Sequence, residues 1–389
     1  MKLDGLKVLD LSAFLPGPHM TMMMADHGAD VIMVEPANGT GEPTRVIGQT
    51  TPDGVSVWFR NIARGKRSLK LNLKDPRGQA LFHALAENAD VVVEAFRPGV
   101  VKRLAVDYET LSAHNPGLVY CSISAFGQTG ARAQKPSHDT GVQALAGLID
   151  LTRGLEDDKP AMPAIPFADA SASLMALSAI LMALYRRTQT GKGDYVDMAM
   201  YDAALAWVPN VTGPVFAEDA HPAPKTMRSF GGSALTNLYE TADGQFLAFS
   251  GPEIKFATNL LTALGRPDLL EIAKLEPGPA QAPLRDFLAD TFKSEPLAHW
   301  QRVLEPIDCA WSWVRSLKDA FDDPVTADRG MVFTDAEGHR HIGPPIHFLH
   351  EPPQPNPSVQ AFGADSLEIA REAGLDDAEA AALRKEGVI

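Results

Sequence analysis

The first two hundred residues alternate short apolar runs with amphipathic stretches, and few folds accommodate this alternation. Helical spacing is found at residues 19–27, after a predicted chain break at Pro16-Gly17-Pro18, and again at residues 77–87. The strand-like runs are residues 6–11, 29–35, 89–94, 118–123 and 195–198. Strands that alternate with helices form a parallel sheet covered by helices. The sequence therefore predicts an α/β fold with ligands at the carboxyl ends of the strands.

Composition excludes several classes of protein. Hydrophobic residues make up 45% of the 389 residues and charged residues 22%, which is typical of a globular protein. The net charge of −14 argues against a nucleic-acid partner, because phosphate backbones are bound by clustered Lys and Arg. The two cysteines, Cys121 and Cys309, cannot form a disulfide framework or a thiolate metal site.

One stretch of the acidic chain is basic. Between Arg60 and Arg103 there are ten Lys and Arg residues against four acids. This local excess indicates a confined site for a small polyanion. A solvated basic surface without a ligand is the alternative.

The rest of the chain indicates a second, smaller domain. Residues 208–232 are rich in Pro and Gly, and a predicted hairpin follows at residues 238–249, with its turn at Asp243-Gly244. We expect a large domain at residues 1–199, a linker at 200–230, a smaller α+β domain at 231–320, and a second linker and C-terminal segment at 321–389 that returns to the large domain. Residues 366–389 are predicted to form one or two acidic surface helices.

The chain has no predicted targeting or membrane segment. Its N-terminus alternates charged and apolar residues and so lacks the core of a signal peptide. The longest apolar stretch, residues 174–185, is too short to cross a bilayer. We therefore expect a cytoplasmic protein without a membrane partner.

Two patterns fall short of cofactor motifs. Gly39-Thr40-Gly41 follows a strand but lacks the third glycine of a dinucleotide-binding loop. Four histidines are close together in the sequence near the C-terminus, but their context favours hydrogen-bonded or solvated roles over a metal site. These histidines are His339, His341, His347 and His350.

Three side chains stand in places typical of chemistry. His138 lies in a loop before an apolar segment, Asp169 is predicted to open a helix, and Glu253 follows a predicted strand. Each has a structural alternative: a hydrogen-bonded loop histidine, a helix cap and a solvated acid, respectively. Composition and spacing leave these alternatives open.

A series of ordered motifs resembles the CaiB/BaiF family, or class III coenzyme A (CoA) transferases, which includes the α-methylacyl-CoA racemases. The motifs are residues 15–18 (LPGP), 25–35, 64–69 (RGKRSL), 71–74 (LNLK), 94–99 (EAFRPG), 126–130 (FGQTG), 190–193 (TGKG) and 239–244 (YETADG). Because these motifs extend over nearly the whole chain, the resemblance is specific for the family.

The resemblance implies a large Rossmann-like domain, a small domain and an interlocked homodimer. Each active site would lie between the large domain of one chain and the small domain of the other. The resemblance also implies that CoA, as part of the substrate, is the only cofactor, and it gives the basic stretch a ligand. The residues implied to line the nucleotide are Leu71, Asn72, Leu73, Lys74, Ala95, Phe96, Arg97 and Arg103.

The resemblance also implies roles for the three candidate side chains. Asp169 matches the nucleophilic aspartate of the transferases and the acid/base aspartate of the racemases, whereas His138 and Glu253 match the histidine and its supporting glutamate in the racemases. The sequence favours an acyl-CoA racemase that inverts the α-carbon of a 2-substituted thioester. Backbone N–H groups at the start of the Asp169 helix are expected to bind the enolate oxygen. The alternatives are a CoA transferase working through an aspartyl-CoA thioester and a non-catalytic protein that binds CoA thioesters.

Overall fold

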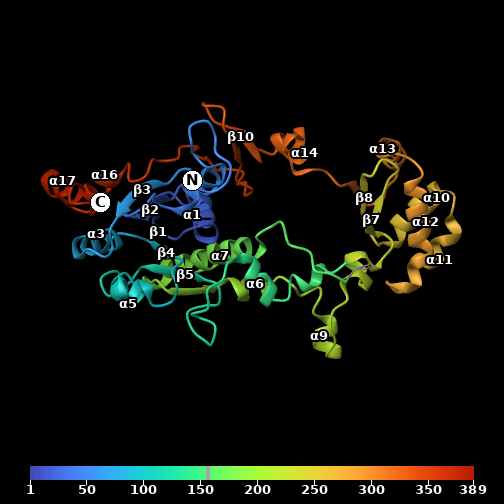
Figure 1. The fold of residues 1–389 in the computed structure, drawn as a ribbon, viewed down its shortest axis with the longest axis horizontal. Coiled ribbons are helices and arrows are strands. Elements are labelled where there is room, and N and C mark those ends of the chain that lie inside the picture. Colours follow the sequence, from blue (N-terminus) through green and yellow to red (C-terminus); the bar gives the residue numbers. More distant parts are fainter. Residues whose placement is uncertain (155–157) are drawn as a thin grey trace. The chain divides into compact units, whose positions relative to one another are not determined.

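The computed structural model describes residues 1–154 and 158–389, which divide into two compact units (Figure 1). Unit 1 comprises Met1–Ala146, Pro163–Trp207 and Pro324–Ile389. Unit 2 comprises Gly147–Met162 and Val208–Asp323. The chain therefore leaves the first unit and returns to it.

Unit 1 is built on a six-stranded, wholly parallel sheet, so the predicted α/β class is confirmed. The strand order is β3-β2-β1-β4-β5-β6, the Rossmann order, and it reverses between β1 and β4. The strands are β1 (Lys7–Leu11), β2 (Asp30–Pro36), β3 (Arg67–Leu71), β4 (Val91–Glu94), β5 (Val119–Ser124) and β6 (Tyr195–Ala199).

Strand β3 is not among the predicted strands, because Arg67 and Lys70 give this segment the pattern of a basic surface. In the structure Ser68, Leu69 and Leu71 are buried, and Arg67 pairs with Asp30 at 2.6 Å. An ion pair at the sheet edge thus accommodates a charge inside a strand.

Unit 1 contains helices as well as the sheet. They are α1 (Pro16–Asp26), α2 (Val57–Ala63), α3 (Pro76–Ala86), α4 (Val100–Arg103), α5 (Tyr108–Ser112), α6 (Asp139–Leu145), α7 (Phe167–Thr190), α8 (Met200–Leu205), α15 (Pro324–Asp328), α16 (Ser366–Glu372) and α17 (Asp377–Lys385). A short hairpin, β10 (Val332–Thr334) and β11 (Arg340–Ile342), belongs to the same unit. The predicted break at Pro16 is wrong: α1 begins there, because a proline in the first helical turn loses no hydrogen bond.

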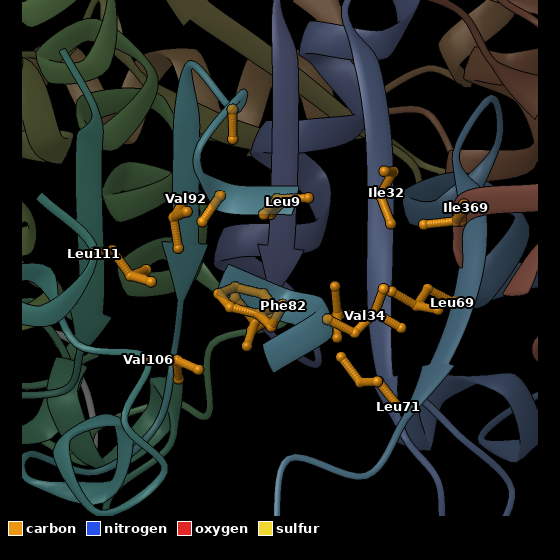
Figure 2. Packing of buried hydrophobic residues seen from close by; sticks show 14 of the residues in the cluster. Leu9, Ile32, Val34, Leu69, Leu71, Phe82, Val92, Val106, Leu111 and Ile369 are labelled. Carbon is orange, nitrogen blue, oxygen red and sulfur yellow. The ribbon is translucent and has the colours of Figure 1, made fainter. Parts of the chain in front are cut away.

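One face of the sheet packs on α3 and the C-terminal helices (Figure 2). Phe82 of α3 is fully buried among Leu9, Val34 and Val92 of the strands. Ile369 of α16 is also fully buried and lies beside Ile32 and Leu69 in Figure 2. Of the one or two predicted C-terminal surface helices, two are present, and they complete the core as well as covering the surface.

Helix α7 contacts α1, β5 and β6. By length and composition, its 24 residues could cross a membrane. The apolar segment is therefore longer than the stretch at residues 174–185 indicated. Ala168, Ala172, Ala176 and Ile180 form a fully buried stripe, which is the pattern of a core helix that packs on a sheet.

Unit 2 has its own hydrophobic core around an antiparallel sheet of order β7-β8-β9. The predicted hairpin is confirmed as β7 (Thr236–Glu240) and β8 (Phe246–Ser250), and β9 is Trp311–Trp313. Its helices are α9 (Gly213–Glu218), α10 (Ile254–Ala263), α11 (Leu270–Ala273), α12 (Ala282–Lys293), α13 (Leu297–Leu304) and α14 (Leu317–Asp322).

Candidate active site

A cavity of about 720 Å³ opens at the carboxyl ends of β1, β2 and β3. Its wall includes six of the eight residues that the resemblance assigns to the nucleotide. These are Leu71, Asn72, Leu73, Lys74, Phe96 and Arg103. The cavity lies where an α/β sheet is expected to hold a ligand, beside the reversal of strand order.

A smaller cavity, of about 350 Å³, follows the ends of β4 and β5. Its wall contains His138 and Asp169 together with the remaining two nucleotide residues, Ala95 and Arg97. Phe96 borders both cavities. The structure therefore brings two of the three candidate chemical side chains and the basic loop after β4 to one place.

Asp169 is held in the first turn of α7 by a neighbouring carboxylate. Asp139 Oδ1 accepts hydrogen bonds from the backbone N–H groups of Ala168, at 2.7 Å, and Asp169, at 3.1 Å. Burial, and then the negative charge of Asp139, raises the pKa of Asp169 to about 7. Asp139 is a functional residue that was not predicted, although its place directly after His138 was a usable signal.

The expected enolate-binding site at the start of α7 is wrong. Asp139 already occupies the N–H groups of Ala168 and Asp169, and those of Phe167 and Ala170 donate to the carbonyls of Ile165 and Pro166 at 2.8 and 3.0 Å. With all four groups bonded, the start of α7 has no donor left for a ligand.

His138 precedes α6 and is exposed, and its ring lies edge-on to that of Phe14, with centroids 5.5 Å apart. Glu253 precedes α10 and is also exposed. Glu253 belongs to unit 2, whereas His138 and Asp169 belong to unit 1, so its support of the histidine stays a prediction.

Ion pairs with acids neutralise half of the ten cations between Arg60 and Arg103. Five of its cations pair with carboxylates: Arg60, Arg64, Lys66, Arg67 and Arg77. The other five form no ion pair with any acid in residues 1–154 and 158–389: Lys70, Lys74, Arg97, Lys102 and Arg103. Three of these, Lys74, Arg97 and Arg103, line the cavities, so the charge available to a polyanion is concentrated there.

The histidines near the C-terminus are hydrogen-bonded in part. His339 and His341 both lie within 3.1 Å of Asp335 Oδ2, and a hairpin carries all three residues. Asp335, Glu337 and His339 are close enough together to hold a metal ion. His339 and His341 already share the inner carboxylate oxygen, as expected for hydrogen-bonded histidines.

The Rossmann strand order, the two cavities at the strand ends and the carboxyl group with a raised pKa define an α/β protein with the site of an enzyme. The sequence profile of CoA-transferase family III matches residues 3–366, so the chain belongs to this family. It is an enzyme of CoA thioesters, which sets aside a non-catalytic binding protein.

Relatives of both activities are similar to the chain over its length. The acetyl-CoA:oxalate CoA-transferase of Acetobacter aceti is 32% identical and covers 98% of this chain and 95% of its own. The human alpha-methylacyl-CoA racemase is 30% identical, and the match covers 100% of this chain and 98% of the racemase. A CaiB/BaiF family protein from Brucella suis has a crystal structure that matches with a TM-score of 0.83, at 30% identity, over 95% of this chain and 99% of the other.

Proposed function

We propose that the protein is an acyl-CoA racemase or epimerase that inverts the α-carbon of 2-substituted acyl-CoA thioesters. The observation that carries the proposal is the environment of Asp169, in the same cavity as His138. Burial and Asp139 raise the pKa of Asp169 to about 7. A group with a pKa near the working pH can both remove and return a proton.

The proposed reaction is a 1,1-proton transfer. One of the pair His138 and Asp169 removes the α-proton as a base, leaving an enolate of the thioester. The other, already protonated, delivers a proton to the opposite face of the same carbon. The product is the other stereoisomer, and no bond to sulfur is broken. At the end of the reaction the base is protonated and the acid is deprotonated. Arg97 lines the same cavity and forms no ion pair with an acid in the described part of the chain, so it offers a positive charge to the enolate oxygen.

Lys74 and Arg103 are proposed to bind the phosphates of CoA in the larger cavity. Both are cations without an ion pair among the described residues, and phosphate oxygens form charge-assisted hydrogen bonds with such groups. With CoA in the larger cavity and Phe96 at the junction, the acyl group would reach the smaller one.

Deuterium exchange tests the proposal. A single enantiomer of a 2-methylacyl-CoA is incubated with the protein in heavy water, without any acceptor acid. We expect deuterium at the α-carbon together with loss of optical purity, and neither with Asp169→Asn or His138→Ala. His114→Ala, at an exposed histidine of unit 1, is the matched control and should retain the wild-type rate. Full exchange by Asp169→Asn would contradict the proposal.

A CoA transferase is the second candidate, because relatives at 32% identity carry that name. In this case Asp169 attacks the thioester carbonyl as a nucleophile and CoA leaves as a thiolate, giving a mixed anhydride. The signature is CoA exchange that requires a second acid, inactivation by hydroxylamine in the presence of acyl-CoA, and no α-deuterium.

We also propose that the enzyme is a homodimer that needs no cofactor beyond the CoA of its substrate. Light scattering is expected to give twice the mass of one chain. Treatment with a chelator should leave the rate of exchange unchanged, and a loss that zinc or magnesium restores would contradict this expectation.

A further inference from the structure

Phe14 has an unusual backbone for its residue type. It lies between β1 and α1 with φ 66°, in the left-handed region that favours glycine. Phe14 lines the smaller cavity. A bulky residue persists in this conformation only where the surrounding structure fixes it, and such residues cluster at functional sites.

A buried carboxylate holds the Phe14 backbone. The N–H group of Phe14 donates to Glu42 Oε1 at 2.8 Å, and Glu42 is 3% exposed. Glu42 Oε2 accepts from the N–H group of Thr44 at 2.6 Å and from its hydroxyl. The N–H group of Glu42 donates in turn to Glu35 Oε2 at 2.8 Å, at the end of β2. Both oxygens of Glu42 therefore act as acceptors, and the sheet anchors the whole group.

The ring of Phe14 contacts His138. The centroids are 5.5 Å apart and the planes meet at 79°, an edge-to-face geometry that aromatic pairs favour. Across residues 1–154 and 158–389, no hydrogen bond holds the imidazole of His138. Within unit 1, the Phe14 ring is the aromatic group that packs against the imidazole, and its bulk limits how the imidazole turns.

We propose that Phe14 is a positioning residue that orients the His138 imidazole in the smaller cavity, and that Glu42 acts by holding Phe14. The inference rests on the proposed proton transfer, in which the imidazole must face the α-carbon of the substrate. A phenylalanine at φ 66° places a large ring against His138, which glycine at the same backbone conformation cannot do.

Nuclear magnetic resonance of the histidine rings tests the contact without turnover. Phe14→Leu removes the ring current, so the ring C–H resonances of His138 should shift. Glu42→Gln must place an amide NH₂ group against either the Phe14 or the Thr44 donors, so it should shift the same resonances in the same direction. Phe348→Leu is the matched control, because the ring of Phe348 lies edge-on to that of His27, also at 5.5 Å. Phe348→Leu should shift the ring C–H resonances of His27 and leave those of His138 unchanged. Glu87→Gln removes one negative charge at an exposed position, and it therefore controls for the charge that Glu42→Gln removes.

Kinetics test the positioning role. We expect Phe14→Leu to slow α-proton exchange about tenfold, because small misplacements of a reacting group are costly, while the Kd for CoA changes less than about twofold. Phe14→Gly, whose backbone tolerates φ 66°, should slow exchange equally without backbone strain. The double variant Phe14→Leu/Glu42→Gln should be no slower than the slower single variant.

The outcomes separate the two proposals. Multiplicative effects in the double variant, or a His138 resonance unmoved by Phe14→Leu, would overturn the inference while the proposed function stands. Absence of exchange in the wild-type protein would overturn the proposed function, and the resonance shifts would still decide whether Glu42 acts through Phe14.

Discussion

At the scale of single residues, two carboxylates accept hydrogen bonds from the backbone of residues that line the smaller cavity. Asp139 caps the first turn of α7, and Glu94, 1% exposed, accepts from the N–H group of Phe96 at 2.7 Å. Neither pairs with a cation among the described residues, and Glu94 is therefore a buried carboxyl group without a compensating positive charge. We expect pH to act through Glu94 and Asp169, because the pKa of each is raised to about 7.

Asp139→Asn should shift the pH dependence of exchange. The charge of Asp139 helps to raise the pKa of Asp169 to about 7, so its removal lowers that pKa. A base works when deprotonated, and the acid limb of the rate profile should therefore move to lower pH. The asparagine oxygen can still accept from Ala168 and Asp169, which preserves the helix start. Asp202→Asn, an exposed acid on α8, is the control. An unmoved acid limb would show that Asp139 does not tune the reacting group.

Glu94→Gln should reduce the decrease in the free energy of unfolding that occurs as pH rises from 5 to 8. Burial raises the pKa of Glu94 from 4.5 to about 7, so the folded protein holds a proton that the unfolded chain has released. The free energy of unfolding therefore falls as pH rises through this window, by on the order of 3 kcal/mol for this group. Glutamine stays neutral and can still accept from Phe96. Urea unfolding at both pH values checks this, with Glu87→Gln as the control, and equal losses in all three proteins would contradict it.

At the scale of elements, close approach of the backbone shapes the larger cavity. Gly78 lies in the first turns of α3, and a Cβ atom there would lie 2.2 Å from the carbonyl oxygen of Asn72. The absence of a side chain lets α3 start directly against the loop that follows β3. That loop, Leu71 to Lys74, lines the cavity. One glycine thus couples helix packing to the proposed CoA site.

Gly78→Ala should weaken both stability and CoA binding. The added methyl group forces α3 away from the loop, which typically costs about 1–3 kcal/mol. Because the loop moves, the Kd for CoA should rise. Calorimetric binding and urea unfolding measure the two effects. Gly213→Ala on α9, where a Cβ atom meets nothing within 4 Å, should change neither. Weaker stability with unchanged CoA binding would mean that the loop does not contribute to the site.

At the scale of the whole molecule, the candidate residues are divided between two units. His138 and Asp169 belong to unit 1 and Glu253 to unit 2. The family resemblance implies that the partners come from different chains of a homodimer. Activity would then depend on assembly rather than on one folded chain.

Mixing two inactive variants tests this dependence. In a heterodimer of His138→Ala and Glu253→Gln chains, one shared site contains both variants and the other contains neither. After unfolding and refolding together, random pairing should restore about a quarter of the wild-type exchange rate. Each variant refolded alone is the control. If His138 and Glu253 act within one chain, the mixture should exchange no faster than either variant refolded alone.

The amino-acid sequence predicts the α/β class and five of the six strands of the parallel sheet, because hydrophobic periodicity is a property of neighbouring residues. It missed β3, where charged residues interrupt the pattern and an ion pair with Asp30 compensates for one of them. It also placed the C-terminal helices only at the surface, because burial of Ile369 depends on a sheet formed three hundred residues earlier.

At the candidate site, motif order alone pointed to His138, Asp169 and the residues around Lys74 and Arg97. Three features became visible only in the folded chain. Asp139 accepts hydrogen bonds from the N–H groups at the start of α7, ion pairs neutralise half of the cations in the basic stretch, and Glu42 holds Phe14 against His138. The physical reason is that hydrogen bonding and electrostatics depend on distance in space, to which sequence separation is a poor guide: Phe14 and His138 are more than a hundred residues apart, yet their rings touch.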